Sequence, residues 1–317
     1  MFGKLIKRAG RYAGVEIIRS DPGDFRWSHT VEEYYPVTPK VRWQKGKSPH
    51  TQLSEKLEKN RVAYGAFLDL LMANASLIHG IPYDRKTDDP NFPFWNNPWF
   101  TALDAAALVN VMVWKRPLRY CEIGSGHSTC FAKYTINALG LDTKITSIDP
   151  APRQSIDRIC DRVIRSPLES CDLSIFDELS SGDVVFFDGS HRAFANSDVV
   201  VFFFEVMPRL KSGVLVHIHD IFVPDDYPAD WKRRLYNEQY ILAAMLMCEH
   251  QAFRVIAPIA FICQDEVLCA QAKRAFVSPN GGRDIPFRPG GSFWLEIERA
   301  EGLEEGHELA EKTAVVL

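Results

Sequence analysis

The sequence predicts an α/β fold with a mostly parallel sheet covered by helices on both faces, and two observations support it. Short apolar runs of strand length recur along the chain: 118–123, 144–148, 162–164, 183–187 and 213–218. Helical patterns separate several of these runs: 127–139, 152–160 and 194–210. Near-continuous apolar strands that alternate with helices are typical of a parallel sheet buried on both faces. We expect two further strands, in 252–263 and 292–299, which would bring the sheet to seven strands and allow an antiparallel edge.

A different pattern precedes the alternating part. Residues 20–60 are rich in Pro, Trp, Tyr and charged side chains, and they predict an irregular arm. A helical apolar face follows within 53–79, and then a loop with several prolines over 80–98. A helix over roughly 99–114, ended by Pro117, leads into the first strand.

These boundaries predict three parts: an N-terminal extension over 1–98, a sheet domain over 99–299 and an acidic tail over 300–317. Residues 2–13 place apolar side chains opposite basic ones at helical spacing. We expect a docked or frayed terminal helix there, although a basic amphipathic helix can also rest on a membrane surface.

The composition excludes several classes of protein. With 46% hydrophobic residues among 317, the chain has enough apolar material for a core, which excludes disorder over most of its length. A net charge of −4 argues against a general nucleic-acid binder. No apolar run reaches the roughly 20 residues that span a bilayer, and the first residues lack the apolar stretch of a signal peptide. None of the 7 cysteines has C-x-x-C spacing, which favours reduced thiols and a cytoplasmic location.

The first strand runs into a glycine turn that opens a helix. Gly124 and Gly126 permit tight backbone geometry and the close approach of a ligand. Ser128 and Thr129 can cap the start of the helix, where free N–H groups attract an anionic group. A G-x-G sequence alone is weak evidence, since a glycine turn is often only a turn.

The next strand strengthens the case for a nucleoside cofactor. Asp149 ends that strand, where a carboxylate can bind both hydroxyls of a ribose; capping of the next segment is the structural alternative. Thr129 occupies the third small position of the dinucleotide fingerprint, and no G-K-[ST] follows, so neither a dinucleotide site nor a P-loop is expected. Glu122 would repel a pyrophosphate but suits a cofactor with an ammonium group.

The stretch from Glu122 to Thr129, together with Asp149, resembles the first motif of class I S-adenosylmethionine-dependent methyltransferases. The resemblance implies a Rossmann-like, doubly wound sheet with S-adenosylmethionine as cofactor. It implies that Gly124 and Gly126 flank the methionine part of the cofactor and that Ser166 and Pro167 lie near the adenine. The residues implied in cofactor binding are Glu122, Gly124, Ser125, Gly126, Ser128, Asp149, Ser166, Pro167 and Asp188.

Ionisable side chains follow the fourth and fifth predicted strands. Asp188 and His191 come after one, and His219 and Asp220 after the other. Because ligands of parallel sheets gather outside the carboxyl ends of the strands, we expect these four residues to converge. They could hold a divalent metal that lowers the pKa of a substrate hydroxyl, with His191 as general base. His217 should share a face with His219, since side chains alternate along a strand.

The same segments resemble those of metal-dependent small-molecule and sugar O-methyltransferases. The resemblance implies Asp188 and Asp220 as magnesium ligands and His191 as the base, with Asp188 also a catalytic residue. His219 stands where that group has a carboxylate. Because a neutral imidazole is a poorer magnesium ligand, this favours manganese, another transition ion or no metal. The flanking sequence, over roughly 94–300, resembles bacterial methyltransferase-like proteins.

Several aromatic residues allow two interpretations each. The loop over 225–231 could close over a substrate or form an ordinary surface loop. Tyr236 and Tyr240, like Trp95 and Trp99, are better explained as packing than as parts of a binding site.

The sequence therefore predicts an S-adenosylmethionine-dependent O-methyltransferase of a small-molecule or sugar hydroxyl. A metal-dependent hydrolase that uses the Asp/His residues is a second hypothesis, and a non-catalytic cofactor-binding protein is a third. No nucleic-acid partner is expected, and a homo-oligomer is left open.

Overall fold

The computed structural model describes residues 40–85, 88–152, 155–248, 252–279 and 281–299. Contacts divide the chain into Met1–Thr38 and a compact unit over Pro39–Leu317, and the fold described here is that of the second unit. The docked or frayed helix predicted at 2–13, residues 20–39 of the irregular arm and the acidic tail lie outside the described residues. Among the described helices, none combines the length and the apolar character needed to cross a membrane.

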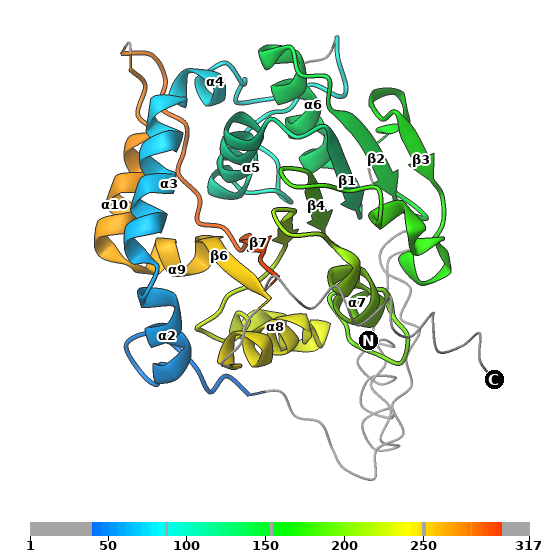
Figure 1. The fold of residues 1–317 in the computed structure, drawn as a ribbon. Coiled ribbons are helices and arrows are strands. Elements are labelled where there is room, and N and C mark those ends of the chain that lie inside the picture. The colour runs from blue at the N-terminus through cyan, green and yellow to red at the C-terminus, as the bar shows by residue number, and fades with distance from the viewer. Residues whose placement is uncertain (1–39, 86–87, 153–154, 249–251, 280, 300–317) are drawn as a thin grey trace, which may run out of the picture. The chain divides into compact units, whose positions relative to one another are not determined.

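A seven-stranded sheet with strand order β3-β2-β1-β4-β5-β7-β6 forms the centre of this unit (Figure 1). The strands are β1 Arg119–Ile123, β2 Lys144–Ile148, β3 Arg162–Ile164, β4 Val184–Phe187, β5 Leu215–Ile218, β6 Phe253–Pro258 and β7 Phe293–Ile297. β1 to β5 pair in parallel, whereas β7 is antiparallel to both β5 and β6. The predicted doubly wound, mostly parallel fold is confirmed. The antiparallel strand, however, lies inside the sheet, and the two edges are β3 and β6.

Helices cover both faces of the sheet, with α5 and α6 on one face and α7 and α8 on the other (Figure 1). Helix α3 packs against α10, α5 and β6. The longer helices are α2 Thr51–Glu58, α3 Arg61–Ala73, α5 Ala102–Lys115, α6 His127–Leu139, α8 Glu238–Met247 and α10 Glu266–Arg274. The shorter ones are α4 Ala75–His79, α7 Asp198–Val201 and α9 Ile259–Gln264. A π turn, Phe202–Val206, continues α7, and 3₁₀ turns lie at Asp157–Ile159, Leu168–Ser170, Leu173–Phe176, Met207–Arg209 and Ala229–Arg234.

Most predicted segments form the expected elements, and α6 has the predicted bounds. The helical segment 53–79 is instead three helices, because the chain breaks at Lys59–Asn60 and again at Asn74. The expected strand over 252–263 was partly wrong: the strand ends at Pro258, and a buried helix follows. Periodicity could not separate the two, since a continuous apolar run fits a buried strand and a buried helix alike.

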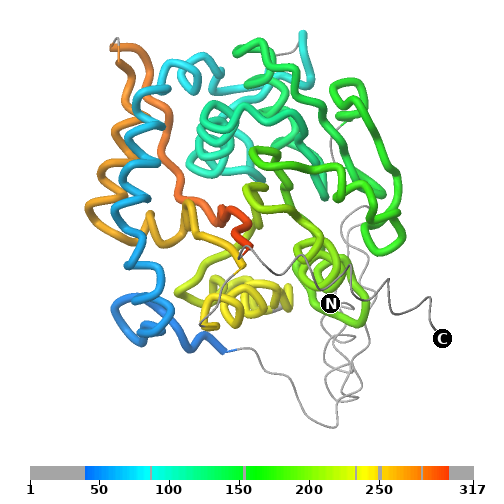
Figure 2. The backbone as a smooth tube through the Cα atoms, in the orientation of Figure 1, coloured from blue at the N-terminus to red at the C-terminus, as the bar shows by residue number. Residues whose placement is uncertain are grey.

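The core strands bring three loops together at one edge of the sheet. Ile123, Phe187 and Ile218 end β1, β4 and β5 at the same level, because those strands pair in register. All three side chains are buried. The residues that follow them, including Asp188 and His219, therefore share the carboxyl edge. Figure 2 traces how the chain returns from α10 alongside α3 to place β7 next to β5 at this centre.

Candidate functional site

The glycine turn after β1 lies directly against the end of β4. Gly124 has φ +79°, and a Cβ atom there would lie 1.9 Å from the carbonyl oxygen of Asp188. Only glycine fits this position, since both the backbone conformation and the contact exclude a side chain. Gly126 has φ 175°, which any residue adopts, and a Cβ atom there would meet nothing within 4 Å. The turn, which is the predicted cofactor loop, thus lies against Asp188, and the space beside Gly126 is open.

Asp149 fastens this turn to the end of β2. Its carboxylate accepts hydrogen bonds from the backbone N–H groups of Ser125 and Ala151, both at 2.8 Å. The hydroxyl of Ser125 also bonds that of Ser147, at 2.7 Å. Each carboxylate oxygen has lone pairs left over, so the predicted contact with a ribose stays a prediction.

Glu122 lies beneath the turn and is fully buried. Its carboxyl group accepts hydrogen bonds from the hydroxyls of Tyr120, at 3.2 Å, and of Thr129. The hydroxyl of Thr129 in turn accepts a hydrogen bond from the N–H of Gly126, at 3.0 Å. Burial raises the pKa of Glu122 to about 8, so much of the group is neutral near pH 7. In this arrangement Glu122 braces the turn, and its predicted contact with an ammonium group stays a prediction.

The remaining predicted cofactor residues lie at the same edge of the sheet. Ser128 is buried in the first turn of α6. Ser166 and Pro167 follow β3 and are partly buried. β3 adjoins Asp149 through the hydrogen bond from the Asp149 N–H to the carbonyl of Ile164, at 3.1 Å.

The predicted convergence of Asp and His side chains is present in the structure. His191 Nε2 lies 3.2 Å from Asp188 Oδ1 and 3.6 Å from Asp220 Oδ2. His219 Nδ1 lies 3.6 Å from Asp188 Oδ1 and 3.5 Å from Asp220 Oδ1. His191 and Asp220 both have positive φ, of 61° and 55°, so tight turns aim them at each other. The four residues form one cluster, called here the Asp/His cluster.

Two buried carboxylates that the sequence analysis did not identify contact the imidazoles of this cluster. Glu238, at the start of α8, accepts a hydrogen bond from His191 Nδ1 and is fully buried. Asp104, in α5, lies 3.7 Å from His219 Nε2. It also accepts from the N–H of Ser292 at 2.8 Å and from the Thr101 hydroxyl at 2.8 Å. A lone Asp within the apolar pattern of 102–114 is the one signal that could have identified Asp104, and Glu238 resembles any acidic residue at a helix start.

Exposure increases across the cluster in one direction. The Glu238 and Asp104 side chains are 0% and 2% exposed and the two imidazoles 8%, whereas Asp220 reaches 17% and Asp188 37%. Asp188 is therefore the member most accessible to a ligand. It is also the residue whose backbone touches Gly124.

The charges of the cluster are strongly coupled. Burial alone would lower the pKa of His191. The carboxylates of Glu238 and Asp188 instead raise this pKa well above its ordinary value. Burial also opposes the proton of His219, yet Asp188 and Asp220 raise its pKa. The pKa of Asp188 moves the other way, since the two imidazoles overcome its burial and hold it well below the usual range. These shifts favour the charged forms of Asp188 and of both imidazoles.

The predicted metal ligands do not form a cation site in this arrangement. His219 lies 3.6 Å from Asp188 and 3.5 Å from Asp220, at the distances of ion pairs. In the part of the chain that the structure describes, no group of three or more His, Cys, Asp or Glu residues is arranged to hold a metal ion.

Other residues considered from the sequence have structural partners. His217 shares a face with His219, and their ring centres are 5.6 Å apart. The ring of His217 stacks on that of Phe186 with 3.7 Å between the centres, and its Nε2 forms a hydrogen bond with the Ser292 hydroxyl at 2.8 Å. Trp95 is buried against Phe131.

The 225–231 loop and the aromatic residues after it lie close to His191. The ring of Tyr236 is 4.5 Å from that of His191 and contacts Trp231 of the 225–231 loop at 5.8 Å. Tyr240 is partly exposed and donates its hydroxyl proton to Asp226 at 3.0 Å. Trp99 is 50% exposed.

Comparisons with known proteins are consistent with this geometry. Residues 121–221, which run from β1 to the Asp/His cluster, match a family described as a methyltransferase domain. No curated protein matches the chain. The match confirms a methyltransferase domain over these residues, as the sequence predicts.

Solved structures give a weaker likeness. An S-adenosylhomocysteine-bound methyltransferase of Podospora anserina, PaMTH1, is 14% identical, with a TM-score of 0.39, over 73% of this chain and 88% of that one. The plantazolicin methyltransferase BpumL, also in complex with S-adenosylhomocysteine, is 11% identical, with a TM-score of 0.38, over 78% of this chain and 100% of that one. Identities and scores this low say nothing about the acceptor.

Proposed function

We propose that this chain, whose residues 121–221 form a methyltransferase domain, methylates a hydroxyl group of a small molecule or sugar. The contact of Gly124 with the backbone of Asp188 carries the proposal. It places the predicted cofactor turn and the Asp/His cluster side by side at one edge of the sheet. A methyl donor held by the turn would therefore present its methyl group to a hydroxyl held at the cluster.

The cofactor would lie along the carboxyl ends of β1, β2 and β3. The open side of Gly126 offers room for the methionine part, Asp149 has free lone pairs for a ribose, and Ser166 and Pro167 adjoin it for the adenine. When bound, the group supplies a methyl carbon on a positively charged sulfur. The ionised Asp188 next to the turn favours that positive charge.

His191 is the proposed general base. The neighbouring carboxylates favour the charged form of His191, so it can act as a base only after Nε2 has released its own proton. Nδ1–H then stays directed at Glu238, and Nε2 faces Asp188. An acceptor hydroxyl bonded there would form its new O–C bond as the C–S bond breaks, and its proton would pass to Nε2. Asp188 would hold the hydroxyl and Glu238 would orient the imidazole.

A divalent metal at Asp188, His219 and Asp220 remains a prediction from the sequence. Because these side chains face one another as ion-pair partners, no step is assigned to a metal. A chelator added to the active protein, followed by magnesium or manganese, would show whether a metal is needed.

The experiment compares variants of the base in methyl transfer and in cofactor binding. We expect His191→Ala and Asp188→Ala to reduce the rate of S-adenosylhomocysteine release about 100-fold or more with a panel of hydroxylated small molecules and sugars. Cofactor affinity, measured by calorimetry, should change little in His191→Ala. If both variants instead lose cofactor binding and keep the normal rate when saturated, the roles assigned here are wrong.

A further inference from the structure

A cluster of aromatic and cationic side chains adjoins the proposed base on its outer side. It consists of Tyr227, Trp231 and Tyr236, which follow β5, together with Arg192 and Arg234. Tyr236 is the centre, since its ring lies 4.5 Å from His191, 5.9 Å from Tyr227 and 5.8 Å from Trp231. We call this group the arginine-aromatic cluster.

Two guanidinium groups converge on the ring of Tyr236. The Cζ atoms of Arg192 and Arg234 each lie 5.5 Å from its centre. Arg234 also stacks on Trp231 at 3.9 Å, and Arg192 Nε donates a hydrogen bond to the carbonyl of Arg234 at 2.8 Å. The two cations are thus held close together by rings and a carbonyl oxygen.

Neither guanidinium has a carboxylate partner among the residues that the structure describes. Other arginines of the chain do, since Arg61 pairs with Asp265 and Arg254 with Glu296. Two neighbouring cations without a counter-charge repel each other, and an anion between them would relieve that repulsion. Guanidinium groups bind a planar carboxylate through paired N–H donors, which makes it a well-matched ligand.

We infer that the acceptor of the proposed methyl transfer is a hydroxyl-bearing carboxylate, held at its carboxylate end by Arg192 and Arg234. The inference rests on the proposed function of the Asp/His cluster. Asp188 and Asp220 would repel the carboxylate, whereas the two arginines attract it, so only one orientation is favourable. That orientation points the hydroxyl end at His191 and Asp188. A phosphate would gain more attraction from the two arginines and meet more repulsion from the acidic residues. The carboxylate is chosen because its planar pair of oxygens matches the paired N–H donors of a guanidinium.

Matched pairs of probes test the inference without requiring turnover. The full chain, saturated with S-adenosylhomocysteine, is titrated by calorimetry with 4-hydroxybenzoate and its uncharged amide, and with glucuronate and glucose. We expect the carboxylate of at least one pair to bind about tenfold more tightly than its neutral partner. We also expect 4-hydroxyphenyl phosphate to bind less tightly than 4-hydroxybenzoate.

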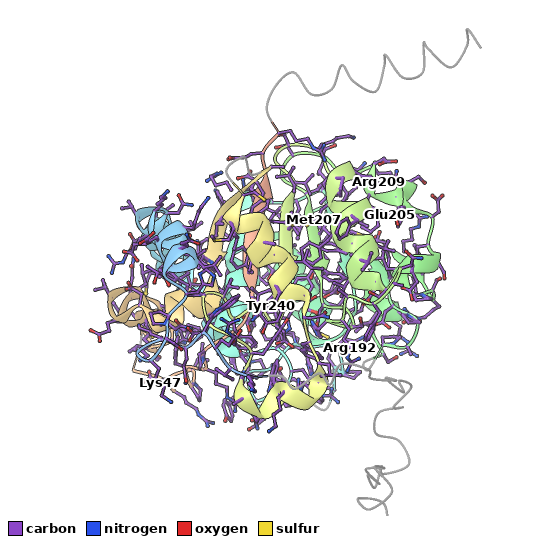
Figure 3. All side chains as sticks on the ribbon, turned by 90° about the horizontal axis from the view of Figure 1, so that it is seen from below. Lys47, Arg192, Glu205, Met207, Arg209 and Tyr240 are labelled. Carbon is purple, nitrogen blue, oxygen red and sulfur yellow. The ribbon has the colours of Figure 1, made fainter. Side chains whose placement is uncertain are left out.

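Arginine variants separate this site from general charge. Arg234→Gln removes ring contacts only, so it should fold normally and lose most of the preference for the carboxylate. Arg192→Gln should do the same, and its thermal unfolding shows whether the lost hydrogen bond disturbs the loop. Arg209→Gln is the control, since Arg209 pairs with Asp177 and lies away from Arg192 on the face seen in Figure 3. It should keep the full preference.

Several results would overturn the inference. These are equal affinity within both pairs, no binding of either carboxylate at about 10 mM, tighter binding of the phosphate, or an equal loss in Arg209→Gln. Binding that follows the prediction without any methyl transfer would count against the proposed function alone.

Discussion

At the scale of single residues, the two glycines of the turn after β1 have different reasons to be glycine. Gly124 combines a positive φ with a backbone contact that leaves no room for a Cβ atom. Gly126 has φ 175°, outside the left-handed region, and a Cβ atom there would meet nothing within 4 Å. The sequence suggested both residues equally, and only the structure distinguishes a requirement of folding from a requirement of binding.

Substitution by alanine should separate these two roles. Gly124→Ala should lower the free energy of unfolding by about 3 kcal/mol or more, because the backbone of Asp188 would have to move. Gly126→Ala should leave stability within about 1 kcal/mol and weaken the binding of S-adenosylmethionine, because its Cβ would fill the space proposed for the cofactor. Denaturant unfolding and calorimetry measure the two effects. Equal losses of stability in both variants would refute the distinction.

Glu122 gives a prediction for the pH dependence of stability. Its pKa in the folded protein is raised to about 8 by burial, so the folded state holds a proton that the unfolded state releases near pH 4.5. The stabilisation is complete below the unfolded value and is lost as the pH rises toward 8, by up to about 1.4 kcal/mol per pH unit. Glu122→Gln, which cannot ionise, should show a flatter profile of unfolding free energy between pH 5 and 8. Parallel profiles for the two proteins would show that Glu122 is ionised in the fold.

At the scale of elements, the strands were the most predictable part of the chain. Each parallel strand is a short apolar run that ends at glycine or an ionisable residue, so its position follows from local sequence. The segment 252–263 was less predictable, because β6 and the buried helix α9 are both apolar and join at Pro258. The place of β7 inside the sheet also could not be read locally, since pairing between β5 and β7 depends on residues far apart in the chain.

Asp226 connects three elements and offers a test of how they are held. Its carboxylate accepts the N–H groups of Arg42, at 2.5 Å, and Trp43, at 2.9 Å, as well as the hydroxyl of Tyr240 in α8. The segment that carries Lys47 therefore lies on the same face as Tyr240 (Figure 3). Asp226→Asn should weaken these bonds by about 1 kcal/mol each and speed proteolysis within 40–50. Tyr240→Phe removes one hydrogen bond and keeps both backbone contacts, so a protease should cleave this variant at nearly the normal rate. Fast cleavage of both variants would show that the backbone hydrogen bonds do not hold the segment.

Helix α8 positions the proposed base through Glu238, and this too can be tested. Glu238→Gln keeps a partner for His191 Nδ1 but removes the charge, so we expect the rate of methyl transfer to fall about tenfold or more with little change in cofactor affinity. The rate should fall further in Glu238→Ala, because the His191 ring then also loses its orientation. Steady-state rates and calorimetry on the two variants provide the comparison. Normal rates of methyl transfer in both variants would show that Glu238 does not position His191 for the reaction.

At the scale of the whole molecule, the candidate site is assembled from distant parts of the sequence. Asp188, His191, His219 and Asp220 were predictable as a group, because two parallel strands end beside each other. Asp104 and Glu238 were not, since each reaches the cluster from a helix whose packing no local pattern specifies. The arginine-aromatic cluster escaped prediction for the same reason, as Arg192 and Arg234 meet only through the folding of the loop after β5.

We propose that the turn after β1 and the Asp/His cluster form one site for a methyl donor and its acceptor. The most direct measurement is a calorimetric titration of the full chain with S-adenosylmethionine, because every assigned role depends on that complex. We predict saturable binding of one cofactor per chain with a Kd below about 100 μM. If no binding occurs at about 1 mM cofactor, the turn after β1 is only a structural feature and does not form a site with the Asp/His cluster.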